Sequence, residues 1–244
     1  MKDLNLIELT DLEKRYGKKE ALTGINLTIG RGKIIGLLGP NGSGKTTLIK
    51  LLNGLLQPTS GEIKVNGKAP GVDSKKIISY LPDKMYFADW MKIADLMDFF
   101  EDFYEDFDRK NAEGMCETLK INTEAKIKSL SKGNKEKVQL VLVMCRKAQL
   151  YLLDEPIAGV DPAARDFILD TILNNYNEEG TVIISTHLIA DIEKIMDEVI
   201  FIKEGNIVTY KSADDLREES GKSIDALFRE IFHTDVYRGG DEVC

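Results

Sequence analysis

The amino-acid sequence predicts an α/β fold in which a mostly parallel sheet is joined by an antiparallel β subdomain and an inserted α-helical subdomain. Three observations lead to this fold class. Strand-like segments broken by turns fill the first eighty residues, helical periodicity runs from about residue 85 to residue 146, and buried strands then alternate with a helix. We therefore expect one domain, with a core at residues 1–83 and 147–211, a helical subdomain at 84–146 and a short helical tail at 212–244.

The first eighty residues predict short strands around one deeply buried strand. Residues 33–38 form a nearly continuous apolar run that ends in a glycine-rich turn, as expected of a strand buried on both faces of a parallel sheet. A helix should follow from Thr46 to about Asn53. Asn66-Gly67 is a strong hairpin signal. The shorter strands are expected at residues 4–9, 25–29 and 63–65.

The segment after residue 85 carries apolar residues at helical spacing, with acidic residues between them. Residues 95–124 contain ten acids against three bases. We expect Phe99, Phe103 and Phe107 to form an apolar stripe, with the acids on the opposite, solvated face. The residues that show the spacing are Leu96, Phe99, Phe100, Phe103 and Phe107.

The second half of the core repeats the strand and helix alternation. Residues 150–153 and 181–185 predict two more buried strands, with a helix at about residues 162–176 between them. The tail has apolar residues three and four apart, which predicts a short amphipathic helix followed by a polar terminus. Those residues are Ile224, Leu227, Phe228, Ile231 and Phe232.

The composition excludes several classes of function. The 244 residues carry a net charge of −8, which argues against a broad nucleic-acid-binding surface. The longest apolar stretches, such as residues 138–145, are well short of the roughly 18 residues that cross a bilayer. The first residues do not look like a signal peptide, so we expect a cytoplasmic protein. Three widely separated cysteines predict reduced thiols rather than disulfides or a zinc site.

A phosphate-binding motif follows the buried strand at residues 33–38. Residues 39–46 match GxxxxGK[ST], which predicts the core of a P-loop nucleoside triphosphatase. The glycines let the backbone wrap around phosphate oxygens, and the next helix presents its positive end to them. Lys45 should reach the β- and γ-phosphates of ATP, and the Thr46 hydroxyl should bind Mg²⁺. The predicted nucleotide-binding residues here are Gly39, Pro40, Asn41, Gly42, Ser43, Gly44, Lys45, Thr46 and Thr47.

Two adjacent acids follow the apolar residues 150–153. In a parallel sheet, ligands bind at the carboxyl ends of the strands, which is where these acids should emerge. We expect Asp154 to hold Mg²⁺, directly or through water. Glu155 is expected to orient and polarise the attacking water as the general base.

With these motifs, the chain resembles the ATP-binding subunit of an ABC transporter over nearly its whole length. Residues 130–134 read Leu-Ser-Lys-Gly-Asn and stand shortly before the acidic strand. They are similar to the family signature LSGGQ, with Lys132 and Asn134 in place of its third and fifth letters. The resemblance implies that Ser131 and Gly133 act on ATP held by a second ATPase copy.

The resemblance also assigns roles to three isolated residues. Tyr16, in Arg15-Tyr16-Gly17, matches the aromatic residue that stacks on adenine. His187 follows the strand at residues 181–185 and matches the switch histidine, which contacts the γ-phosphate and assists catalysis. Asp161 matches the acid of the loop that crosses the dimer interface.

One position departs from the family pattern. The family usually has a glutamine after a strand where this chain has Asp83. The glutamine binds Mg²⁺ and links the nucleotide to the helical subdomain. Asp83 offers an oxygen on a shorter, charged side chain, so it should contact Mg²⁺ with altered geometry or through water.

The resemblance implies a mechanism and partners. ATP and Mg²⁺ would bind in a head-to-tail dimer of this chain with itself or with a related ATPase. The dimer would dock on integral membrane permease subunits at the inner face of the cell membrane and power solute transport. Within the family, the chain most resembles the ATPases of small export systems. A soluble ABC ATPase, such as one serving iron–sulfur assembly, is the alternative.

The acidic segment at residues 95–124 has two interpretations. It could be a solvated helix face, as such charge runs usually are. It could also dock the membrane partner, because the family receives that partner on its helical subdomain. Cytoplasmic loops of membrane proteins are rich in Lys and Arg, to which an acidic surface is complementary.

Overall fold

A six-stranded, mostly parallel sheet forms the centre of the molecule. The computed structural model describes residues 5–233, without the side chains of residues 163 and 164. The strand order is β5-β6-β7-β3-β8-β9, in which only β9 is antiparallel to its neighbour. This arrangement confirms the predicted fold class. The strands are β3 (Ile34–Leu38), β5 (Ile78–Leu81), β6 (Leu150–Asp154), β7 (Thr181–Thr186), β8 (Glu198–Lys203) and β9 (Asn206–Ser212).

Two apolar clusters cover the two faces of this sheet. Along β6, Leu150 and Leu152 face one cluster while Tyr151 and Leu153 face the other, because successive side chains of a strand point to opposite faces. The first cluster is completed by the antiparallel sheet and by α1 (Lys45–Leu52). The second is completed by α5 (Lys132–Met144), α6 (Pro162–Asn175), α7 (Ile189–Ile192) and the tail helices. The five strands other than β9 are short and mostly buried, as expected of strands covered on both faces.

A separate three-stranded antiparallel sheet has the order β2-β1-β4. Its strands are β1 (Ile7–Tyr16), β2 (Lys19–Ile29) and β4 (Ser60–Val65), all longer than the sequence predicts; Leu4 lies outside the described residues. Asn66 and Gly67 form the predicted turn, both with positive φ (52° and 74°). Only Lys68 pairs back, with Val65, so no second strand forms. Pro70, which cannot donate a ladder hydrogen bond, and α2 (Val72–Ile77) follow at once.

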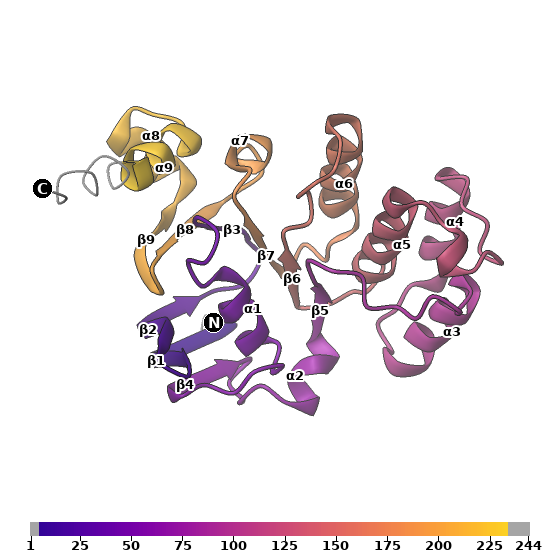
Figure 1. Cartoon of the computed structure of the whole chain (residues 1–244), viewed down its shortest axis with the longest axis horizontal. Coiled ribbons are helices and arrows are strands. Elements are labelled where there is room, and N and C mark those ends of the chain that lie inside the picture. The colour runs from indigo at the N-terminus through magenta and orange to yellow at the C-terminus, as the bar shows by residue number, and fades with distance from the viewer. Residues whose placement is uncertain (1–4, 234–244) are drawn as a thin grey trace, which may run out of the picture.

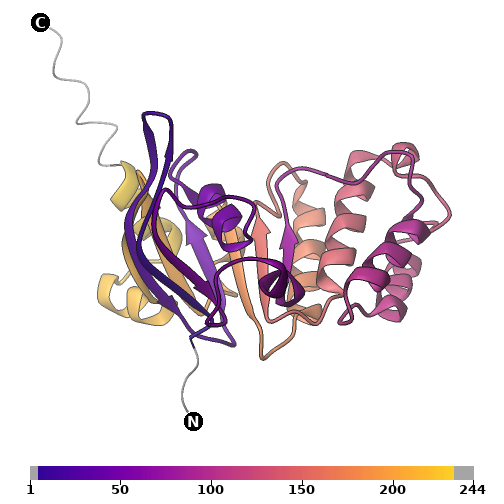
Figure 2. The same ribbon diagram turned by 90° about the horizontal axis from the view of Figure 1, so that it is seen from below.

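The helical subdomain lies beyond β5, at one end of the molecule (Figures 1 and 2). It contains α3 (Ile93–Phe103), α4 (Arg109–Thr118), the short 3₁₀ helix η1 (Ile127–Ser129) and α5. These elements share a third apolar cluster of their own. Among the described residues, no helix is long and apolar enough to span a membrane.

The predicted phenylalanine stripe is wrong. The buried face of α3 carries Ile93, Leu96, Met97 and Phe100, which follow one another at spacings of three and four. Phe99 and Phe103 fall on the outer side, where they are 46% and 66% exposed and stack on each other with ring centroids 4.4 Å apart. Phe107 is not on this helix, which ends at Phe103.

The chain's last described helices cover the other end of the central sheet (Figure 1). They are α8 (Ala213–Ser220) and α9 (Ile224–His233). The predicted amphipathic helix is α9, and its Phe228 and Phe232 rings lie 5.9 and 6.1 Å from the buried ring of Phe201. The predicted polar terminus after His233 lies outside the described residues.

Replacing Phe228 by alanine should lower the free energy of unfolding by about 2 kcal/mol, because it empties part of the contact with β8. Phe103→Ala is the control: that ring is mostly exposed, so the change should cost less than about 1 kcal/mol. Urea unfolding of both variants makes the comparison. Equal losses would contradict this assignment of inner and outer phenylalanines.

Candidate nucleotide site

The phosphate-binding loop runs from β3 into α1, as predicted. Gly44 adopts a φ of 113°, which non-glycine residues avoid, and a Cβ there would lie 2.7 Å from the carbonyl oxygen of Ala21 in β2. Gly205, in the turn between β8 and β9, approaches the same oxygen just as closely, with a hypothetical Cβ at 2.8 Å. The Gly205 amide donates to the Ser43 carbonyl at 2.9 Å. Backbone contacts therefore hold the loop against both sheets.

Lys45 is almost fully buried beneath this loop. Its Nζ donates to the Gly39 and Pro40 carbonyl oxygens at 2.7 and 3.2 Å and lies 3.5 Å from Glu155 Oε1. Burial lowers the pKa of the Lys45 amine, and the nearby carboxylates of Glu155 and Asp154 oppose that shift. A buried amine within the phosphate loop is suited to bind anionic oxygens.

Asp154 joins three elements at the end of β6. Its Oδ1 accepts hydrogen bonds from Thr46 Oγ1 at 3.1 Å and from Ser185 Oγ at 2.6 Å. The other oxygen, Oδ2, is buried without a partner. Burial raises the pKa of Asp154, while the two hydroxyl donors oppose the rise. Sequence reasoning named Thr46 and Asp154 but gave no role to Ser185, whose contact depends on the pairing of β6 with β7.

Glu155 leaves the strand in a strained conformation, with a φ of 52°. Its backbone amide donates to the Ser185 carbonyl at 3.0 Å. Its side chain lies between two predicted catalytic residues, with Oε2 3.0 Å from His187 Nδ1 and Oε1 near Lys45. The three residues predicted as catalytic are therefore in one place.

The surrounding pocket has a volume of about 390 Å³ and brings together most of the predicted residues. Tyr16, about half exposed, lies at its rim. Asp83 lines it two residues after the end of β5, and its charge contributes to the raised pKa of Asp154. Lys19 and Ala21 of β2 also line it and were missed by sequence reasoning. The lining is Tyr16, Lys19, Ala21, Asn41, Gly42, Gly44, Lys45, Thr46, Thr47, Asp83 and Glu155.

Eight predicted residues do not line this pocket. Five of them belong to the phosphate loop or contact a lining residue: Gly39, Pro40, Ser43, Asp154 and His187. The other three, Ser131, Gly133 and Asp161, neither belong to that loop nor line the pocket. Ser131 and Gly133 are exposed at the start of α5, where the Ser131 hydroxyl caps the helix by accepting from the Asn134 amide at 3.3 Å. Asp161 is exposed just before α6. All three thus lie on outward surfaces of the same chain rather than against its own phosphate loop.

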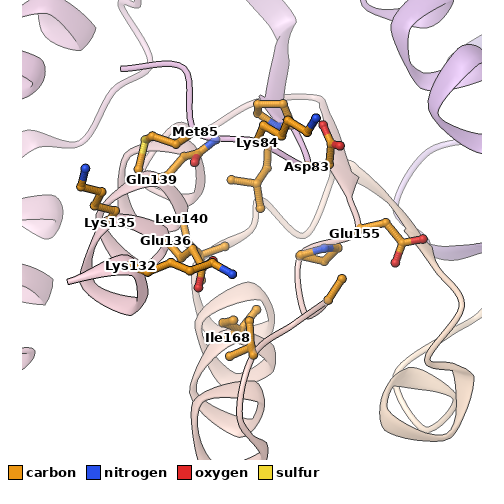
Figure 3. A pocket seen from close by; sticks show the side chains of 15 residues that line it. Asp83, Lys84, Met85, Lys132, Lys135, Glu136, Gln139, Leu140, Glu155 and Ile168 are labelled. Atoms are coloured by element: carbon orange, nitrogen blue, oxygen red, sulfur yellow. The ribbon is translucent and has the colours of Figure 1, made fainter. Parts of the chain in front are cut away.

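A neighbouring cavity of about 360 Å³ lies between α5 and the segments that follow β5 and β6 (Figure 3). One side of the cavity is lined by α5, through Lys132, Lys135, Glu136 and Gln139. The other sides are lined by residues of two segments, Pro82–Met85 and Glu155–Val160. Gln139 is 3% exposed, and its Nε2 has no hydrogen-bond partner. This cavity shares Asp83 and Glu155 with the nucleotide pocket.

The oxygen atoms and the phosphate loop of this site fit Mg²⁺ and a nucleoside triphosphate. A buried carboxylate oxygen without a partner stands beside a threonine hydroxyl, and hard divalent cations prefer oxygen ligands of this kind. Thr46 and Asp154 would hold the ion, and Asp83, which lines the same pocket as Thr46, would add an oxygen ligand directly or through water. The glycine loop and Lys45 would hold the phosphates.

A buried strand, a glycine loop entering a helix, and an acidic strand end beside it define a P-loop nucleotide hydrolase. The family model described as ABC transporter matches residues 22–158, so this chain belongs to the ABC transporter family as an ATP-binding subunit and hydrolyses ATP.

Individual relatives agree with this assignment. The ABC transporter ATP-binding protein YtrB of Bacillus subtilis is 33% identical over 95% of this chain and 78% of its own length. The SkfA peptide export ATP-binding protein SkfE of the same organism is 30% identical over 84% of this chain and 88% of its own. A solved ATP-binding subunit of an ABC transporter superposes with a TM-score of 0.82, at 26% identity over 92% of this chain and 98% of that one. These relatives support transport and give no support to the soluble alternative.

Replacing Lys45 by methionine should abolish the rise in melting temperature that ATP produces, because a ligand stabilises only the fold that binds it. Without ATP, stability at neutral pH should change little or increase. A lowered pKa means that the fold disfavours the charged amine; this penalty is present at pH 7 and fades only as the pH rises through the lowered pKa.

Lys50→Met, in the same helix but outside the nucleotide pocket, is the matched control and should keep the response to ATP. Thermal unfolding with and without ATP measures both. A normal ATP response in the Lys45 variant would contradict its placement in the phosphate site.

Proposed function

We propose that this chain energises an exporter and that it hydrolyses ATP in a magnesium-dependent, head-to-tail dimer. The observation that carries the catalytic part is the position of Glu155. Its carboxylate stands at the carboxyl end of β6, between the amine of Lys45 and the imidazole of His187. A base placed between a phosphate-binding amine and a second polar group is what hydrolysis of a terminal phosphate needs.

The residues of the site then have distinct roles in hydrolysis. Glu155 takes a proton from the attacking water, and His187, hydrogen-bonded to it, orients its carboxylate and contacts the γ-phosphate. Lys45 moves from the loop carbonyls to the phosphates and stabilises their growing charge. Mg²⁺, when bound, neutralises the phosphate oxygens. Tyr16 at the rim would stack on the adenine ring.

The dimer is supported by where the remaining residues lie. Ser131 and Gly133 begin α5 on an exposed surface, where a helix presents its positive end, yet they do not line their own chain's pocket. A second subunit in head-to-tail arrangement would bring them over the bound ATP. Asp161, also exposed, would lie in the same interface.

Glu155→Gln should keep ATP affinity and lose turnover, because the amide no longer accepts the proton while the phosphate loop is intact. ATP-bound dimers should then accumulate. Nucleotide binding, phosphate release and size-exclusion chromatography with Mg·ATP measure the three quantities. Glu136→Gln, in the neighbouring cavity, is the control that should leave turnover unchanged. Undiminished turnover in Glu155→Gln, or monomers with bound ATP, would count against the base or the dimer.

Export and a membrane partner are proposed from the relatives and from one surface. SkfE is named for peptide export, which favours export here. The outer side of α3 carries the stacked Phe99 and Phe103 rings and the exposed acid Asp102, and the exposed acid Glu105 follows two residues after the helix ends. An apolar pair among acids suits a basic permease loop with apolar anchors, and would place the chain at the cytoplasmic face of the membrane.

Part of the acidic charge is already neutralised within the chain. Arg109 binds Asp98, Glu101 and Glu113, with Asp98 at 2.5 Å. By contrast, Asp102 and Glu105 have no ion-pair partner among the described residues, so they are the acids most available to a partner.

Changing Glu101, Asp102 and Glu105 together to lysine should reduce the fraction of the protein that sediments with permease-containing membranes, while ATPase activity without membranes persists. A second triple variant keeps the same change of net charge elsewhere, at the exposed residues Glu62, Glu179 and Glu218, and should sediment normally. Equal sedimentation of the two variants would remove this surface as the docking site.

A further inference from the structure

A buried arginine connects the helical subdomain to the edge of the central sheet. Arg146 stands between α5 and β6 and is 2% exposed. Its Nε and Nη2 donate to the two carboxylate oxygens of Asp106 at 2.8 and 3.0 Å. Its guanidinium also lies 3.7 Å from the ring centroid of Tyr104. Both partners belong to the segment between α3 and α4.

The same guanidinium binds the start of β5 and the end of α2. That strand is at the edge of the sheet and pairs only with β6. Arg146 donates to the carbonyl oxygen of Ile78, the first residue of β5, and to that of Lys76, in the last turn of α2, at 2.6 Å. The Ile78 carbonyl faces away from β6, because successive carbonyls of an extended chain point to opposite sides. The Ile77 carbonyl between them accepts from Gln149 on the β6 side.

The two ends of α5 differ in how they are held. Near its C-terminus, the Ser79 hydroxyl of β5 donates to the Val143 carbonyl at 2.7 Å, and the Asp108 amide donates to the Cys145 carbonyl at 2.7 Å. Its N-terminal half lies over the 360 Å³ cavity, where Gln139 Nε2 has no partner. The helix is thus fixed beside Arg146 and has free space beneath its other end.

We propose that Arg146 is a positioning residue for ATP hydrolysis, which holds β5, and through β5 the nucleotide-site residue Asp83, in a fixed relation to the helical subdomain. Asp83 follows the end of β5 by two residues, so a shift of the strand moves it directly. The inference rests on the proposed placement of Asp83 in the nucleotide site. It assigns the connection between subdomain and nucleotide to a guanidinium that touches neither ATP nor Mg²⁺.

The test compares Arg146→Lys and Asp106→Asn with Arg109→Lys. A lysine at 146 cannot make the two-pronged contact with Asp106 and also reach both carbonyls. We expect kcat to fall by about 10- to 100-fold, as for small misplacements of a reacting group, while the Kd for ATP stays within about twofold. Arg109 also binds three groups, but all lie within the helical subdomain, so its variant should keep kcat.

Amide hydrogen exchange of residues 78–81, measured without nucleotide, gives a second readout. Exchange should speed up in the Arg146 and Asp106 variants and not in the Arg109 variant, because only the first pair loosens the outer edge of β5. Asp106→Glu, which keeps a carboxylate, should recover part of kcat. If Arg146→Lys does not fold, the Asp106→Asn variant tests the proposal instead. Asp106 is partly exposed, so its replacement should leave the fold intact.

Unchanged exchange and unchanged kcat in Asp106→Asn would overturn the proposal. A parallel loss of ATP binding and kcat would also overturn it, since that pattern indicates a purely structural role. Faster exchange with normal kcat would mean that Arg146 holds β5 but that β5 does not control catalysis through Asp83, which would also overturn the proposal. Failure of the wild-type chain to hydrolyse ATP would instead count against the catalytic site itself.

Discussion

The nucleotide site is built around one carboxylate that has no exposed surface. Burying an ionised carboxylate is costly unless its oxygens are paired, and Asp154 meets this condition for only one oxygen, through Thr46 and Ser185. Those two bonds draw α1 and β7 onto the end of β6. The other carboxylate oxygen of Asp154 has no hydrogen-bond partner, and a bound cation would compensate its charge. The constraint that assembles three elements therefore also suits the magnesium site that we propose.

Sequence patterns predict the parts of the site that are local in the chain. The glycine loop and the two acids after residues 150–153 carry their chemistry within a few consecutive residues, so their positions follow from the strand that precedes each. Ser185 and Arg146 could not be found in this way. Their partners lie 31 and 40 residues away, and the contacts exist only because particular strands and loops are adjacent in the fold.

The misplaced phenylalanines have a different cause. Two apolar faces compete on α3, and both satisfy a helical period. Ile93 and Met97 decide between them by burying the face that includes Phe100, which leaves Phe99 and Phe103 outside. A stripe of large rings is thus an ambiguous signal when smaller apolar residues share the helix. Here the outer face has neighbouring acids, and it is available to another molecule instead of the core.

The meeting of two glycines at Ala21 has a consequence for how this site can vary. Gly44 and Gly205 approach one backbone oxygen of β2, and no side chain of the pocket takes part in that contact. The approach of the phosphate loop to β2 is therefore limited by a main-chain oxygen rather than by a side chain of the pocket. Side chains along the rim can be exchanged during evolution without altering this approach, whereas a Cβ at either glycine would clash with the Ala21 carbonyl. Base recognition can drift in this architecture while the reach to the phosphates stays constant.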